Sequence, residues 1–282
     1  MKFKIGILID CLLLPLDQAL EKAREFGADG VQIYAAGRFS LLDMSPAERR
    51  ELKKRVDGIG LEVSALCGDL GGRGFEEASA NPEKITRSKK IIDIAGEFGT
   101  RIVTTHIGVV PRQKDARYRI LLDAVKRIAA YCRPSGSFFA IETGPEPTPI
   151  LKEFIEDAAE PQLKVNFDPA NQVMIHGENP AETAPLLSDY IVHTHAKDGC
   201  QVKPCDPVEI YNAFADNNPN GIVFDDYFLD LPLGRGDVPF PEYLKKLSEI
   251  GYDGYLTIER EAGTDRVWDI GEGVRFLRKL ID

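Results

Sequence analysis

Eight short apolar segments, each rich in β-branched or aromatic residues, recur along the chain, and most are separated by longer amphipathic stretches. This alternation extends from one end of the chain to the other. It is typical of parallel βα units and not of separate β and α domains. The predicted strands are residues 4–10, 30–34, 61–66, 101–106, 137–143, 163–168, 190–195 and 255–259.

The amphipathic stretches carry the start and stop signals of helices. Ser45 and Asn81 each precede a proline, which predicts an N-cap residue followed by proline at the first helical position. Gly27, Gly99 and Gly251 follow amphipathic stretches and predict the left-handed residue that ends a helix. The predicted helices are residues 15–26, 45–56, 81–98, 116–132, 149–158, 180–187 and 241–250.

The count of eight strands favours a closed (β/α)8 barrel, the α/β fold also called a TIM barrel. Such barrels commonly run to about 250 residues as one domain, so we expect residues 1–282 to form a single domain. Similar helix-to-strand turns recur at residues 25–30, 97–100 and 249–254. An open, doubly wound sheet uses the same βα units and is the competing architecture.

Charge and composition exclude several classes of protein. Forty-five acidic residues against thirty-five basic ones give a net charge of -10, which disfavours binding to nucleic acid. No run of about 18 apolar residues is present and residues 1–10 lack the features of a signal peptide, so we expect a cytoplasmic protein that does not bind a membrane. The five scattered cysteines fit a reducing compartment.

Ionisable residues stand at the carboxyl ends of five predicted strands. In a (β/α)8 barrel the active site is built at this end of the strands, so position marks these residues as candidates. The chain has only four histidines, and three of them are in this set. The candidates are His106, Glu142, Asp168, His193, His195 and Glu259.

Four of these candidates come from the last four strands, which are neighbours around a barrel. Three carboxylates and one imidazole can therefore converge on one point, where a metal ion would offset the repulsion between the carboxylates. This ligand set favours Mn²⁺, Mg²⁺ or Co²⁺ and also admits Zn²⁺. The alternative is that each residue acts separately, as a surface cap or as a partner in an ion pair. The predicted ligands are Glu142, Asp168, His195 and Glu259.

The seventh predicted strand carries further candidates. His193 and His195 are two residues apart and face the same side of the strand, and Lys197 keeps this parity if the strand continues. The segment that follows, residues 197–239, is rich in Asp, Asn, Pro and Gly and predicts a long irregular loop. Loops of this length in a compact domain are usually functional.

Several short motifs, in this order and at these strand ends, resemble the xylose isomerase-like TIM barrel family of sugar and sugar-phosphate isomerases and epimerases. The resemblance covers nearly the whole chain. The motifs are Ile-Glu-Thr at 141–143, Asn-Phe-Asp-Pro-Ala-Asn at 166–171, His-Thr-His-Ala-Lys-Asp at 193–198, Leu-Gly-Arg-Gly-Asp at 233–237 and Leu-Thr-Ile-Glu at 256–259.

The resemblance implies that the four predicted ligands hold the metal and that Glu142 and Glu259 also move protons. The second of the strand-seven histidines matches the family's ligand, which leaves His193 to contact the substrate or support the site. His106 matches a histidine near the substrate. Asn171 stands where epimerases of this kind commonly carry a histidine, and we expect it at the substrate.

Two cations can bind a substrate oxygen, carboxylate or phosphate. Lys197 continues the parity of the strand-seven histidines, and Arg235 lies in a turn between two glycines, where a backbone can approach a ligand. The alternative for each is a solvated loop charge.

The predicted ligand set, together with this resemblance, implies a metal-dependent isomerase or epimerase for a small polyhydroxylated substrate, acting by proton transfer through a metal-bound enediolate. A dehydratase or lyase of an inosose-like or dehydroshikimate-like substrate, and a barrel that binds a sugar without turnover, stay open. Endonuclease IV, a more distant relative, needs more histidines than the four present. The oligomeric state is open, a homo-oligomer included.

Overall fold

Eight parallel strands close into a barrel in a computed structural model that describes residues 3–282. Around the barrel the order is β1-β10-β7-β6-β5-β4-β3-β2, which confirms the (β/α)8 prediction and rules out the open sheet. The strands are β1 (Lys4–Leu8), β2 (Gly30–Tyr34), β3 (Glu62–Cys67), β4 (Ile102–Thr105), β5 (Phe138–Glu142), β6 (Leu163–Phe167), β7 (Ile191–Ala196) and β10 (Tyr255–Ile258).

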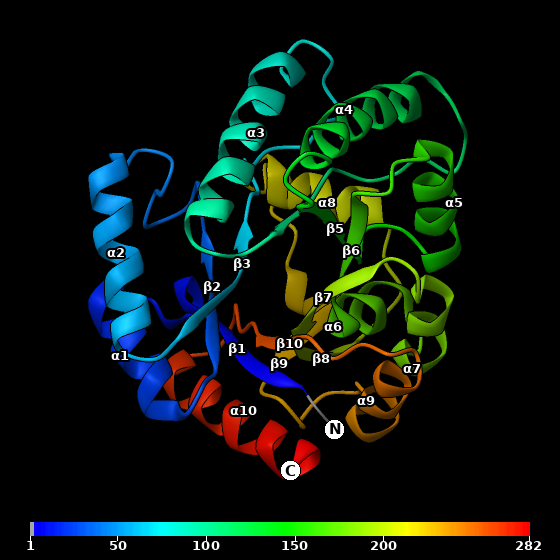
Figure 1. Ribbon diagram of the computed structural model, residues 1–282. Coiled ribbons are helices and arrows are strands. Elements are labelled where there is room, and N and C mark those ends of the chain that lie inside the picture. The colour runs from blue at the N-terminus through cyan, green and yellow to red at the C-terminus, as the bar shows by residue number, and fades with distance from the viewer. Residues whose placement is uncertain (1–2) are drawn as a thin grey trace.

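Helices surround the strands on the outside of the barrel (Figure 1). The strands are therefore buried on both faces, which explains why they read as nearly continuous apolar runs. The surrounding helices are α1 (Leu16–Phe26), α2 (Pro46–Gly58), α3 (Asn81–Glu97), α4 (Ala116–Cys132), α5 (Thr148–Ala158), α7 (Pro180–Thr183) with its 3-10 extension η3 (Ala184–Leu187), α9 (Phe240–Glu249) and α10 (Arg266–Ile281).

The helix boundary signals act largely as predicted. Ser45 forms a capping box: its hydroxyl accepts from Glu48 N–H at 3.3 Å, and Glu48 Oε2 accepts from Ser45 N–H at 2.7 Å. The three glycines that end helices have φ of +86°, +79° and +82° at positions 27, 99 and 251. Asn81 is not an N-cap. It is the first residue of α3, and its side chain donates to the Phe75 carbonyl at 3.0 Å.

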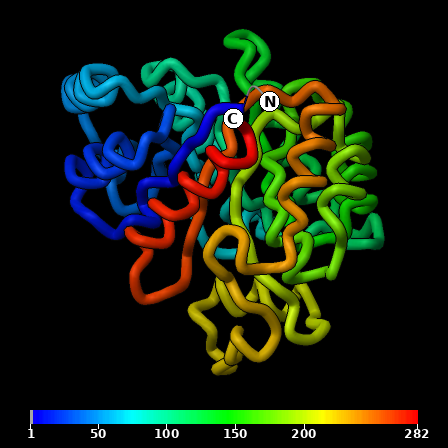
Figure 2. Tube along the Cα trace, turned by 90° about the horizontal axis from the view of Figure 1, so that it is seen from below, coloured from blue at the N-terminus to red at the C-terminus, as the bar shows by residue number. Residues whose placement is uncertain are grey.

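The prediction of an irregular loop over residues 197–239 is wrong. The segment forms an excursion with its own antiparallel sheet, in which β8 (Asp198–Gln201) pairs with β9 (Phe228–Leu231), and with helix α8 (Pro207–Ala215) and the 3-10 turn η4 (Phe224–Asp226) between them. Asp206 caps α8 through its side chain. Figure 2 shows this excursion, coloured yellow to gold, projecting from the end of the barrel opposite the C-terminus.

Several elements were not predicted from the sequence. The first strand ends at Leu8 and not at residue 10, and a 3-10 turn η1 (Ile9–Leu12) follows it. After β6 the chain forms a short α6 (Pro169–Asn171) and a π-helical turn η2 (Gln172–His176). Helix α10 was also missed. Among the described helices, none has the length and apolar character that a membrane span requires.

Candidate metal and substrate site

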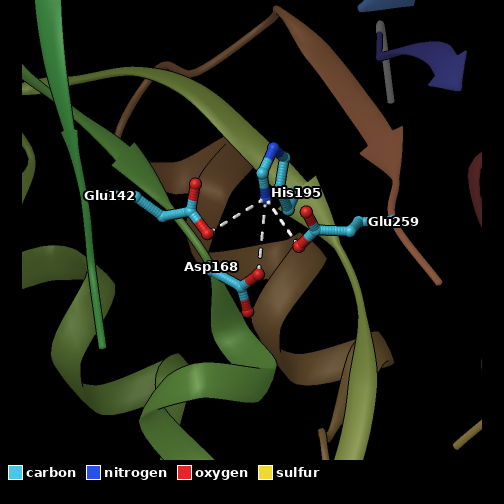
Figure 3. Close-up of side chains that lie close together, drawn as sticks. All are labelled: Glu142, Asp168, His195 and Glu259. Carbon is cyan, nitrogen blue, oxygen red and sulfur yellow. Dashed lines mark ion pairs between the residues drawn. The ribbon is translucent and has the colours of Figure 1, made fainter. Parts of the chain in front are cut away.

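The four predicted ligands converge at the carboxyl ends of their strands, as Figure 3 shows. Glu142 ends β5, Asp168 follows β6, His195 lies in β7 and Glu259 follows β10. One ligand atom from each residue lies within 4.8 Å of the others. Nδ1 of His195 is 3.2 Å from an oxygen of Glu259, 3.4 Å from one of Asp168 and 3.6 Å from one of Glu142.

Two atoms of this cluster are buried without a hydrogen-bond partner. They are Nδ1 of His195 and Oδ2 of Asp168, which lie 3.4 Å apart. The other oxygen of Asp168 accepts from the backbone N–H of Asn171 at 2.9 Å. Buried polar atoms without partners are costly, and two of them beside two further carboxylates form a donor set that fits a divalent cation. The four residues therefore fit the predicted metal.

A hydrogen bond across the barrel fixes the ring of His195. The amide of Gln32 donates to Thr104 Oγ1 at 2.8 Å, which leaves the Gln32 oxygen to accept from His195 Nε2 at 3.0 Å. With a proton kept on Nε2, it is Nδ1 that faces the carboxylates, and this nitrogen would offer its lone pair to an ion once it has lost its proton. Nε2 also lies 3.2 Å from Asn166 Nδ2, but both atoms are donors in this tautomer, so this contact is not a hydrogen bond.

Asn166 links the ligands to the layer beneath them. Its amide donates to Glu142 Oε2 at 3.1 Å, and its oxygen accepts from His193 Nδ1 at 2.8 Å. The other ring nitrogen of His193 is 3.0 Å from the Thr257 hydroxyl, so both of its nitrogens are bound. Burial and the charge of His195 lower the pKa of His193 well below its usual range, and the ring is neutral.

The charges around the cluster favour ionised glutamates. Burial alone would raise the pKa of Glu259, but Lys197 and His195 outweigh it and hold that pKa well below its usual range. Burial likewise opposes ionisation of Glu142, whose pKa is lowered by His106 and His195. Burial raises the pKa of Asp168. Protein cations thus already lie beside the two glutamates in the absence of a metal ion.

A cavity of about 550 Å³ opens onto the cluster. His106 lines it, with Nε2 3.5 Å from Glu142 and Nδ1 3.5 Å from Asp69. Lys197 also lines it, and its ammonium donates to Glu259 at 2.9 Å and to Glu261 at 2.5 Å. The excursion supplies an aromatic wall of Tyr211, Phe214, Phe224 and Phe228.

The chain matches a family of known proteins over residues 20–280, nearly its whole length. It belongs to the xylose isomerase-like TIM barrel family. It is 26% identical over 286 residues to the Methanocaldococcus jannaschii protein named "Uncharacterized protein MJ1311", covering 95% of this chain and 86% of that one. It is 22% identical over 283 residues to the Streptomyces coelicolor protein named "Putative hydroxypyruvate isomerase", covering 94% and 92%.

A crystal structure is similar along the whole chain. It is a xylose isomerase domain protein from Planctomyces limnophilus, with a TM-score of 0.76 and 27% identity, covering 99% of this chain and 96% of that one. The recognition of a xylose isomerase-like TIM barrel from its motifs is thereby confirmed, for the family and for the fold.

The residues predicted to lie at the substrate are found in different surroundings. His106, Asn171 and Lys197 line the cavity. Asn171 donates to Thr143 O at 3.2 Å and lies 3.4 Å from Glu142 Oε1. His193 is 1% exposed and does not line the cavity. It supports Asn166 from below and is not placed to contact a substrate.

Arg235 is exposed and does not line the cavity either. The glycines beside it serve a different purpose, because the loop wraps around the carboxylate of Asp198, which accepts from the N–H groups of Gly234 and Gly236 at 2.8 and 2.9 Å. A Cβ at position 236 would lie 2.3 Å from that carboxylate. The motif therefore closes the excursion, and Arg235 lies outside the lining of the cavity.

Proposed function

We propose that the chain is a divalent-metal-dependent isomerase or epimerase of a small polyhydroxylated carbonyl compound. The observation that carries the proposal is the placement of Glu142 and Glu259, which flank the same buried cluster from two sides (Figure 3). Each belongs to the ligand set, and each borders the cavity. A carboxylate on either side of a bound substrate can remove a proton from one position and return it at another.

The ion is proposed to be held by Glu142, Asp168, His195 and Glu259, with Mn²⁺, Mg²⁺ or Co²⁺ favoured over Zn²⁺. Bound there, it would supply Lewis acidity, which makes the C–H next to a carbonyl more acidic. The unpartnered Nδ1 of His195 and Oδ2 of Asp168 support this assignment.

The chain's own residues would divide the remaining work. Glu142 and Glu259 are held ionised by the cations around them, as a group that accepts a proton must be. His106 and Lys197 line the cavity and present N–H donors to the oxygens of a substrate. Return of the proton to the neighbouring carbon gives isomerisation, and return to the opposite face of the same carbon gives epimerisation.

Exchange of substrate hydrogen with solvent tests this proposal. Protein loaded with Mn²⁺ is incubated in D₂O with a panel of ketoses and polyols, and deuterium uptake is followed by mass spectrometry. We expect uptake by the wild type and none by Glu259→Gln or Glu142→Gln. The control is Glu272→Gln, an exposed carboxylate on α10 that should exchange like the wild type. Undiminished exchange in either site variant contradicts the assignment of that glutamate as a proton carrier.

The same incubation separates the alternatives. An isomer or epimer has the mass of its substrate apart from deuterium, whereas loss of water identifies a dehydratase or lyase. Binding of a sugar to the metal-loaded protein without exchange in any member of the panel identifies a non-catalytic sugar-binding barrel.

A further inference from the structure

The cavity over the metal cluster is lined by many carboxylates and few cations. Six acidic residues line it, and Asp168 lies beneath them. Lys197 is the only lysine among the lining residues, which include no arginine. The lining carboxylates are those of Asp69, Glu142, Asp225, Asp230, Glu259 and Glu261.

Two cations near the cavity are already paired with carboxylates. Lys197 is buried and lies between two carboxylates, those of Glu259 and Glu261. Arg260, behind the wall, pairs with Asp230 at 2.5 Å and with Asp269 at 2.9 Å. An anionic group that approached either of them would lie beside these carboxylates and be repelled by them.

Three backbone donors at the mouth are also occupied by carboxylates. The N–H of Gly71, in the glycine turn at the cavity, donates to Asp69 at 2.8 Å. The N–H groups of Glu261 and Ala262 donate to Asp230 at 2.9 and 3.2 Å. Such groups are the usual means of holding a phosphate where arginine is absent, and here they already hold protein carboxylates.

A divalent ion does not reverse the excess of negative charge in the cavity. With Asp230 neutralised by Arg260, six carboxylates remain in the cavity and the cluster. Lys197, a protonated His106 and a divalent ion together supply four positive charges, and Lys84, which donates to the Gly71 carbonyl at 2.9 Å, supplies a fifth. The site stays negative, and the field of a cleft lined by one sign of charge repels a ligand of the same sign.

We propose that the substrate is an uncharged sugar or polyol and that the site rejects phosphate esters and carboxylates. The inference rests on the proposed function and names the substrate class for it. The aromatic wall suits this class, since the flat rings of Tyr211 and Phe228 can pack against the C–H faces of a sugar while carboxylates accept from its hydroxyls. Hydroxypyruvate, which appears in the name of the Streptomyces coelicolor relative, is an anion and is excluded by this inference.

Asp225 is the residue of this set best suited to a test. It is an exposed residue of η4 that lines the cavity, and it is not one of the metal ligands. Asp226, its neighbour in the same turn, is also exposed but does not line the cavity. A charge reversal at each position changes the net charge of the protein equally, so a difference between them reports the field inside the cavity.

The experiment compares matched ligands on protein loaded with one Mn²⁺ and freed of excess ion. Binding is measured by calorimetry for D-fructose and D-fructose 6-phosphate, for D-tagatose and D-tagatose 6-phosphate, and for hydroxypyruvate. We expect at least one free ketose to bind about tenfold or more tightly than its phosphate ester and than hydroxypyruvate. The difference in affinity should become smaller when the NaCl concentration is raised, because salt screens the repulsion between the anionic ligand and the carboxylates.

The two charge-reversal variants test whether the charge inside the cavity causes this preference. Asp225→Lys should reduce the ratio of affinities for free and phosphorylated ketose several-fold. Asp226→Lys should leave this ratio as in the wild type. A phosphate ester or hydroxypyruvate that binds as tightly as the free ketoses overturns the inference, as does failure of every free ketose to bind. Tighter binding of free ketoses without deuterium exchange would support the inference on substrate class and refute the proposed function. Deuterium exchange confined to phosphate esters would support the proposed function and refute the inference.

Discussion

His195 on β7 donates from Nε2 to the side-chain oxygen of Gln32 on β2, at 3.0 Å across the interior of the barrel. This one bond decides which ring nitrogen faces the three carboxylates. It ties the proposed metal ligand to a residue 163 positions away in the sequence. The orientation of such a partner commonly accounts for a large part of metal affinity.

Replacing Gln32 by methionine should therefore weaken metal binding by about 10–100-fold, because the ring of His195 loses the acceptor that holds its tautomer. Calorimetric titration with Mn²⁺ measures the change. The control is Thr104→Val, which removes the hydrogen bond at the other end of the Gln32 amide and leaves the acceptor in place. Equal metal affinity in Gln32→Met and wild type would show that Gln32 does not position the ligand.

Metal binding should release about one proton per ion at neutral pH. Burial lowers the pKa of His195, but Glu259, Glu142 and Asp168 around it raise that pKa well above its usual range. Without an ion the ring carries a proton near pH 7, and the ion must displace it. Affinity should therefore fall as the pH falls. Titrations in buffers of different ionisation enthalpy report the proton directly, and an enthalpy that does not depend on the buffer contradicts this prediction.

Gly144 should tolerate no side chain. Its φ is +145°, and a Cβ there would lie 2.5 Å from the Tyr211 hydroxyl and 2.7 Å from Asn171 Cβ. Gly144→Ala should cost about 1–3 kcal/mol of unfolding free energy and also weaken metal binding, since Asn171 contacts Glu142.

The control is Gly251→Ala, which has a similar backbone constraint at φ +82° but nothing within 4 Å of the added Cβ. It should lose stability through backbone strain and keep its metal affinity. Urea denaturation and calorimetry together separate the two effects. Unchanged metal affinity in Gly144→Ala would show that the crowding around Tyr211 and Asn171 does not reach the ligands.

Glu146 should make the protein less stable as the pH rises. Burial raises the pKa of Glu146 from 4.5 to about 8, and one of its oxygens is buried without a partner. Between these two values the folded state holds a proton that the unfolded state has lost, so stability falls as the pH increases from about 4.5 to about 8.

Glu146→Gln should remove this fall, and its free energy of unfolding at pH 8.5 should exceed that of the wild type by roughly a few kcal/mol. Urea denaturation at pH 5 and pH 8.5 measures it, with the exposed Glu153→Gln as control. A wild type and a Glu146→Gln variant with the same pH dependence would show that Glu146 ionises freely.

The sequence was sufficient to predict the barrel and the four residues that cluster at its rim, for one physical reason. Parallel strands in a closed barrel bring their carboxyl ends to one rim, so an ionisable residue at the end of an apolar run is placed by topology alone. Glu142 and Asp168 illustrate this, since each stands at or just beyond the last residue of a short buried strand.

The supporting residues lie inside strands and leave a weaker signal. Gln32 and Asn166 are polar residues in the middle of apolar runs, and such residues are usually satisfied within the core. His193 shows the limit of strand parity. It faces the same side as His195, but two residues along a strand amount to about 6–7 Å, which puts it beneath the cluster. The alternation of side chains along a strand shows which face a residue occupies, but not how deep it lies along the barrel axis.

The excursion was missed because its structure depends on contacts distant in sequence. β8 and β9 pair across 26 intervening residues, from Gln201 to Phe228, and β8 holds only four residues, Asp-Gly-Cys-Gln. The Leu-Gly-Arg-Gly-Asp motif likewise suggested a ligand-binding turn around Arg235. Its glycines are instead required by the approach of the backbone to Asp198, a contact that no local pattern indicates.

The most direct test of the central claim is an anomalous difference map from crystals of the wild type soaked in Mn²⁺ and measured at the manganese edge. We predict one strong peak per chain, in contact with Glu142, Asp168, His195 and Glu259. The peak should be lost in His195→Ala crystals treated in the same way. A map with no peak among these four residues, or with its strongest peak elsewhere, would contradict the four-ligand metal site.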